Sequence, residues 1–310
     1  MAGPLLNRSA RIAGFALLGA AGVSCSLAFD LGREQCESAE DCAELGPNTT
    51  CENKVCVAIQ SAGGGGGSSS SGGGGQGQGG EDPLWGCIDE FVSPVTSPTE
   101  MVTYNYRIEL AVNPGQPPPG LMVELCGLLD FTCASPFPID QVDPDGTVIF
   151  TLTADTEAFL KIDGDMLKPS RAYLPTPPVV LPPKQKIIRV VREDEFANIV
   201  LTSGKTYDPT RGTVIMLTVD CNDDRAAGVQ LASDEIDADT IPYYFKGQLP
   251  NFTVLETDLQ GAGGWVNLPV GLVNARAVRT ATGEPIGSAS FSSRANELAY
   301  VPIGPTPGAQ

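Results

Sequence analysis

The sequence contains no histidine among its 310 residues. This absence excludes a Ser-His-Asp triad, a Cys-His pair and every zinc site that uses histidine ligands. Carboxylate-pair or Ser-Lys chemistry would still be available, but no spacing in the chain points to either. We therefore expect no enzyme activity, no catalytic residues, no bound metal and no cofactor.

Basic and aromatic residues are also scarce. The chain has 19 Lys and Arg against 37 Asp and Glu, a formal net charge of −18, and only 6% aromatic residues. A negative surface of this kind repels nucleic acid, so we expect no nucleic-acid partner. The 36 glycines and 26 prolines favour short strands and turns over long helices.

The N-terminus carries an apolar run, Ile12–Val23, that is too short to span a bilayer. Arg8 and Arg11 precede it, and a charged segment followed by a short apolar segment is typical of an export signal. The segment Gly22–Cys25 then resembles a bacterial lipobox, although Gly22 stands where that motif usually has leucine. The alternative is ordinary cleavage near Ala21.

The lipobox resemblance implies that the chain is cut before Cys25, which then carries lipid as the new N-terminus. By the same resemblance, Ser26 after the cysteine favours the outer membrane. We expect an exported protein that is lipid-anchored in the bacterial cell envelope, and therefore has the membrane as a partner. Stable anchoring needs more than one acyl chain, and bacterial lipoproteins carry three.

Nine cysteines is an odd number, and a lipid on Cys25 would leave eight that can pair completely. Four of them, with the spacing C-x5-C-x8-C-x4-C, lie in a segment too short to bury a core. In an oxidising compartment they favour two disulfides over the alternative zinc site. For the other four, the alternative is that one pair stays reduced. The candidate pairs are Cys36–Cys51, Cys42–Cys56, Cys126–Cys133 and Cys87–Cys221.

A tether follows the cysteine-rich segment. Gly63–Gly80 consists of glycine, serine and glutamine and has no apolar side chain to pack. A chain of this composition behaves as a flexible coil with a root-mean-square span of about 20–25 Å.

Strand patterns begin after Trp85. Met101–Val112 alternates between apolar and polar residues, as a half-buried strand does. Glu193–Gly204 is the one predicted helix, with acids in its first turn and a glycine stop. Further strands are predicted at 121–126, 147–153, 158–162, 187–191, 212–221, 226–231, in the segment 257–271, and at 272–279 and 289–294.

Two segments of the sequence share the same pattern of glycine-bearing turns and strands, which indicates an internal duplication. The second copy runs from Val219–Cys221 through Ala227–Val229 and Thr257–Asp258 to Asn267–Gly271. Its pattern of glycine-bearing turns that enter strands resembles the carboxypeptidase regulatory-like, or transthyretin-like, β-sandwich. The cysteine loop Cys126–Cys133 in the first copy is similar to loops of myxobacterial surface lipoproteins.

We therefore expect a mainly β chain with two Greek-key, transthyretin-like sandwiches and one short helix between them. A small disulfide-rich module and a disordered Gly/Ser linker precede these sandwiches. The expected divisions are a signal peptide at 1–24, a lipid-anchored tail at 25–35, the disulfide-rich module at 36–60, the linker at 61–82, the first sandwich at 85–191, a helical connection at 192–209 and the second sandwich at 210–304.

This organisation predicts a non-catalytic envelope lipoprotein that displays two sandwiches for adhesion, envelope structure or binding of a protein partner. The alternatives are a carbohydrate-binding module with a polysaccharide partner and an accessory subunit of an exported hydrolase. A carbohydrate site would need exposed aromatic residues. The candidates are Trp85, Trp265, Tyr243 and Tyr244.

Acidic clusters leave two interpretations open. Asp and Gly cap turns for local reasons, whereas calcium needs six to eight oxygens from converging loops. No cluster follows the spacing of a known calcium loop. The clusters are Asp143 with Asp145, Asp163 with Asp165, Asp220 with Asp223 and Asp224, and Asp234 through Asp239.

Overall fold

The computed structural model describes Ser38 and residues 49–52, 55–58, 84–88, 97–175, 185–202, 204–247 and 249–305, with only the backbone for 49–52, 55–58 and Thr202. The predicted lipidation site Cys25 and the linker lie outside the described residues. The predicted pairs Cys36–Cys51 and Cys42–Cys56 depend on side chains that also lie outside the description.

The chain divides into two compact units, Met1–Ser71 and Gly72–Gln310. In the first unit, β1 (Thr49–Glu52) and β2 (Val55–Ala58) form an antiparallel hairpin in which Cys51 lies opposite Cys56. This hairpin falls inside the predicted disulfide-rich module.

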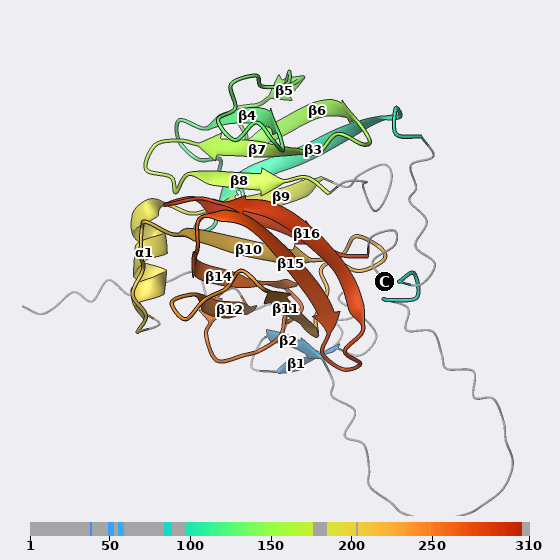
Figure 1. Cartoon of the computed structure of the whole chain (residues 1–310), viewed down its shortest axis with the longest axis vertical. Helices are drawn as coiled ribbons and strands as arrows, with labels where there is room; N and C mark the ends of the chain where they lie inside the picture. Colours follow the sequence, from blue (N-terminus) through green and yellow to red (C-terminus); the bar gives the residue numbers. More distant parts are fainter. Residues whose placement is uncertain are drawn as a thin grey trace, which may run out of the picture. The chain divides into compact units, whose positions relative to one another are not determined.

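The described residues of the second unit form three sheets, and the largest has eight strands. In spatial order they are β13 (Leu249–Asn251), β12 (Ile241–Lys246), β14 (Ala262–Leu268), β10 (Gly212–Thr218), β17 (Leu298–Ile303), β8 (Ser170–Tyr173), β7 (Ala158–Asp163) and β4 (Met122–Gly127). In Figure 1 this central sheet runs from β4 at the top to β12 at the bottom.

Two smaller sheets complete the unit. The four-stranded sheet has the order β5 (Gln141–Val142), β6 (Thr147–Thr153), β3 (Met101–Leu110) and β9 (Lys186–Val190). The three-stranded sheet has the order β11 (Val229–Ser233), β15 (Gly271–Arg279) and β16 (Pro285–Ser293). In Figure 1, β15 and β16 cross in front of β10 and β14.

The central sheet is buried on both faces because neighbouring residues of its strands enter different cores. In β10, Val214 and Met216 belong to the core shared with the three-stranded sheet. Ile215 and Leu217, which alternate with them, pack against the core shared with the four-stranded sheet. The two sandwiches thus lie on opposite faces of one shared sheet.

The halves of the shared sheet meet where β17 pairs in parallel with β8, and we call this pairing, Leu298–Tyr300 with Ser170–Ala172, the seam. β17 pairs on its other side with β10, also in parallel. β8 comes from the first predicted sandwich and β17 from the second. The seam therefore makes one continuous sheet from two distant parts of the chain.

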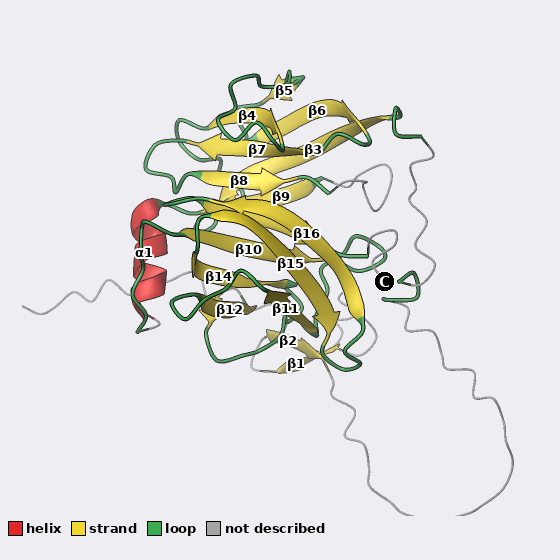
Figure 2. Ribbon diagram, in the orientation of Figure 1, coloured by secondary structure: helices red, strands yellow, loops and turns green. Residues whose placement is uncertain are grey.

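The helix α1 (Glu193–Thr202) confirms the prediction of one short helix in a mainly β protein (Figure 2). Its side chains Phe196 and Val200 are buried in the core that includes the four-stranded sheet. Among the described residues, no helix is long and apolar enough to cross a membrane.

Candidate functional site

The structure buries all four aromatic residues that were predicted to bind a ligand. Trp85 and Trp265 are 6% and 2% exposed, and Tyr243 and Tyr244 are 4% and 5% exposed. The tyrosine hydroxyls serve the fold: Tyr243 donates to the Val214 carbonyl, and Tyr244 accepts from the Leu231 amide, both at 2.9 Å. The predicted aromatic platform is therefore wrong, because strand β12 lies between two apolar layers.

The acidic clusters hold turns together. Asp220 accepts the amides of Asn222 and Asp224 at 2.8 and 3.0 Å, and Asp145 accepts the amide of Thr147 at 3.0 Å. Within the described ranges, no group of three or more Cys, Asp or Glu residues is arranged to hold a metal ion. These contacts favour the turn interpretation over the calcium interpretation.

One acidic turn gives a pH-dependent prediction. A hydrogen bond from Arg211, at 2.6 Å, and then one from Thr240 lower the pKa of Asp237 from 3.8 to about 2. A carboxyl whose pKa is lowered by folding stabilises the protein above pH 3.8 and loses that contribution as the pH falls toward 2. We expect Asp237→Asn to unfold at lower urea than the parent at pH 6, with the difference shrinking steadily as the pH falls from 4 toward 2. A difference that persists unchanged at pH 2 would contradict this origin.

Both disulfides predicted within the second unit are present. Cys126 and Cys133 close a loop after β4, and Cys87 joins Cys221 with a Cα–Cα distance of 5.8 Å. We call the three sheets and α1 of the second unit the body. The Cys87–Cys221 bond links the segment 84–88 to this body. Trp85 is buried in the core that includes the three-stranded sheet, and the Cys221 amide donates to the Leu84 carbonyl at 3.1 Å.

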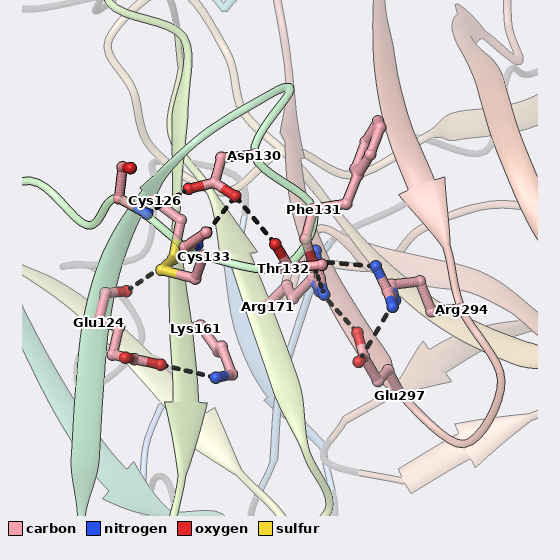
Figure 3. Close-up of a disulfide and its surroundings, with 12 residues drawn as sticks. Glu124, Cys126, Asp130, Phe131, Thr132, Cys133, Lys161, Arg171, Arg294 and Glu297 are labelled. Atoms are coloured by element: carbon pink, nitrogen blue, oxygen red, sulfur yellow. Dashed lines mark hydrogen bonds and ion pairs between the residues drawn. A yellow bond between two sulfur atoms is a disulfide. The ribbon is translucent and has the colours of Figure 1, made fainter.

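The cysteine loop is tied to the seam by two arginines (Figure 3). Arg171 of β8 donates to the Phe131 carbonyl at 2.9 Å, and Arg294 donates to the same oxygen at 3.0 Å. Glu297 pairs with Arg171 at 2.6 Å and with Arg294 at 3.5 Å. Charges from both sides of the seam thus hold one loop carbonyl.

Two ion pairs in Figure 3 have the same length but different burial, which gives a matched prediction. Arg171–Glu297 and Lys161–Glu124 both measure 2.6 Å, with side-chain exposures of 4% and 25% against 39% and 44%. We expect Glu297→Gln to lower the free energy of unfolding by about 2–3 kcal/mol, because it leaves a buried guanidinium without its carboxylate. Glu124→Gln should cost no more than about 1 kcal/mol. Urea denaturation of both variants checks this, and equal losses would contradict it.

A polar cluster lies at one end of the seam, and sequence reasoning missed it. Lys168 is fully buried two residues before Ser170, and Asn296 lies two residues before Leu298. Because Ser170 and Leu298 are register partners in the parallel pair, the two side chains start from the same level. The backbone also joins them, since the Leu298 amide donates to the Pro169 carbonyl at 2.9 Å.

The Lys168 ammonium group has polar and aromatic neighbours. Its Nζ donates to Asn296 Oδ1 and, at 2.5 Å, to the hydroxyl of Tyr207. The Tyr207 hydroxyl donates to Asn296 Oδ1 at 2.9 Å, and Asn296 Nδ2 donates to Glu193 Oε1 of α1 at 3.0 Å. Nζ lies 4.7 and 5.3 Å from the ring centroids of Tyr207 and Phe196.

Burial changes the protonation behaviour of this cluster. Desolvation lowers the pKa of Lys168 to about 8, against the opposing effect of Glu193. Desolvation also raises the pKa of Tyr207 to about 12, so its hydroxyl keeps its proton at neutral pH and can donate it in a hydrogen bond. The arrangement places an amine that can become neutral against the polarised carbonyl of a side-chain amide. No motif in the sequence predicts this cluster, because its residues come together only through the pairing of β8 with β17.

No protein-family model and no curated protein sequence matches this chain. Similar solved structures include the TIE protein of Bacillus anthracis, with 11% identity over 66% of this chain and 34% of that protein and a TM-score of 0.23. A streptococcal ancillary pilin has 14% identity over 66% of this chain and 68% of its own, with a TM-score of 0.20.

The major pilin subunit BcpA of Bacillus cereus is also similar, with 9% identity over 66% of this chain and 69% of its own and a TM-score of 0.21. The chain matches about a third of the length of the TIE protein, at 34%. All three TM-scores are below 0.5.

Proposed function

We propose that this protein is an exported, non-catalytic component of the bacterial cell envelope. A lipid on Cys25 anchors it, and the Gly/Ser-rich segment carries its β-sheet body away from the membrane. The body serves adhesion, envelope structure or binding of a protein partner.

The Cys87–Cys221 disulfide is the observation that carries this proposal. Disulfides of this kind persist in oxidising compartments outside the cytosol. This one lies only seven residues after the glycine-rich segment ends at Gly80, and it joins Cys87 to a residue 134 positions away. A pull transmitted through the linker would therefore reach the body at a covalent crosslink. Such an attachment suits a displayed body better than a loosely joined domain.

The contacts of three polar side chains also support a structural role. Arg171, Glu297 and the Tyr243 hydroxyl each bind partners that hold sheets or loops together. The polysaccharide alternative loses its support with the burial of Trp85 and Trp265, the two tryptophans of the chain. The accessory-subunit alternative stays a prediction, which a co-purifying hydrolase would support.

Membrane fractionation with a matched pair of variants tests the proposal. We expect the wild-type chain in the membrane fraction of a bacterial host, with a diacylglyceryl-modified peptide that begins at Cys25. Cys25→Ala should move the protein to the soluble exported fraction, whereas Ser26→Ala should leave it in the membrane. An unmodified N-terminus near Gly22 in the wild type would overturn the anchor and the display role built on it.

A further inference from the structure

The proposed function does not explain why Lys168 is buried with only neutral hydrogen-bond partners. A lysine is rarely fully buried unless its charge is paired, yet its Nζ here donates to two neutral oxygens, from Asn296 and Tyr207. The acid of the cluster, Glu193, binds the far side of the asparagine amide through Nδ2. The amine of Lys168 thus contacts the carboxamide of Asn296. The Tyr207 hydroxyl binds the oxygen of that carboxamide, and the Glu193 carboxylate binds its nitrogen.

We propose that Lys168 and Asn296 react with each other to form an isopeptide bond between Nζ and Cγ. The neutral amine of Lys168 attacks Cγ of Asn296 and forms the new C–N bond. The bond from Cγ to Nδ2 then breaks, and one ammonia molecule leaves. The reaction exchanges one amide for another, so it needs no oxidant, reductant or cofactor.

Each neighbour has a defined part in this step. The Tyr207 hydroxyl donates to Oδ1 and stabilises the negative charge that develops there in the tetrahedral intermediate. Glu193 takes the proton that Nζ loses and delivers it to Nδ2, which departs as ammonia. Both are catalytic residues for this single event, since each contacts an atom of the reacting carboxamide.

The surroundings favour the reactive form of the lysine. The titratable groups that face the amine are the carboxylate of Glu193 on α1 and the phenol of Tyr207 from the segment before β10. The rings of Phe196 and Tyr207 exclude water from Nζ. The lowered pKa of about 8 makes a neutral amine accessible near physiological pH.

The placement explains what such a bond would do. Lys168 and Asn296 are 128 residues apart in the sequence and lie at the same end of the β8–β17 pair. A covalent bond there would lock the seam between the two halves of the central sheet, and reducing agents would not break it. This inference depends on the fold and not on the proposed lipid anchor, so either can fail without the other.

Intact mass of the full exported chain, measured after complete reduction and denaturation, tests the proposal. We expect the wild-type protein to be lighter than its sequence mass, corrected for processing, by one ammonia molecule. Proteolysis should yield a branched peptide in which tandem mass spectrometry places the link between Lys168 and Asn296. A wild-type protein at its full mass, without this branched peptide, would overturn the proposal.

Variants separate the isopeptide bond from other losses of ammonia. Cyclisation of Asn296 with its own backbone also releases ammonia, but it gives a linear peptide and does not need a lysine. We therefore expect Lys168→Met to regain the full mass, and retention of the ammonia loss in Lys168→Met would contradict the bond.

A second pair of variants tests whether the Glu193 carboxylate transfers the proton. Glu193→Gln keeps the shape and a hydrogen-bonding oxygen but cannot carry the proton, so the ammonia loss should disappear or slow by at least about 100-fold. Asp194→Asn, on the same exposed turn of α1, should react like the wild type. Both side chains are exposed, so circular dichroism should show a native fold in each variant. Unslowed reaction in Glu193→Gln would remove Glu193 from the mechanism.

Discussion

We expect the double variant Cys87→Ala/Cys221→Ala to lose about 5 kcal/mol of unfolding free energy, because its disulfide closes a very long loop in the unfolded chain. The two cysteines are 134 residues apart in the sequence. The bond therefore removes a large part of the entropy of the unfolded chain. It also fixes the segment 84–88, including the buried Trp85, against the second half of the body.

The short disulfide is the control for this prediction. Cys126 and Cys133 are seven residues apart, and the same relation gives about 2.5 kcal/mol for their loop. Urea denaturation of both double variants, monitored by circular dichroism without reducing agent, gives the two values. Equal losses would show that loop closure in the unfolded chain is not the source of the stabilisation.

The second large effect concerns the core that the central sheet shares with the four-stranded sheet. Phe150 is fully buried and stacks on Tyr104 and Tyr106 at centroid distances of 5.3 and 6.0 Å. We expect Phe150→Ala to lower the free energy of unfolding by about 3–5 kcal/mol, the usual cost of removing a buried phenylalanine ring. Both tryptophans lie in the other core, so their fluorescence reports on a region that Phe150 does not touch.

If the seam joins the two halves into one cooperative body, the fluorescence midpoint in urea should fall by as much as the circular dichroism midpoint. Leu129→Ala is the control, because Leu129 is 82% exposed and its truncation should change stability by no more than about 0.5 kcal/mol. A fluorescence midpoint that stays at its wild-type value in Phe150→Ala would show that the halves unfold independently.

Local patterns in the sequence predicted the amphipathic strands and the helix. β3 was found from its strict alternation, and its residues Val102, Tyr104, Tyr106 and Ile108 are buried as that period requires. The glycine stop and acidic first turn located α1 to within two residues. The parity of the cysteines predicted two disulfides that the structure contains.

Several strands of the shared sheet were not predicted, although β10 and β14 in the same sheet were. β8, β12 and β17 were missed because a strand covered on both faces has no alternation of apolar and polar residues. In β8 all four residues, including Ser170 and Arg171, are buried. The burial of Tyr243 and Tyr244 followed from the same omission, since β12 was not recognised as a strand between two cores.

The cluster at Lys168 could not be predicted for a related reason. Its members come from four separate segments, and the parallel pairing of β8 with β17 brings them together. Parallel strands are joined by long connections that carry no turn signal, so nothing local relates Lys168 to Asn296. The burial of Lys168 results from the pairing of the short strand β8 with β17, so the sequence alone does not indicate it.

Scanning calorimetry of the wild-type protein shows most directly whether the seam makes the two sandwiches one folding unit. We expect a single unfolding transition whose calorimetric and van't Hoff enthalpies agree. Two resolved transitions, or a calorimetric enthalpy well above the van't Hoff value, would contradict it and would make each sandwich a separate domain.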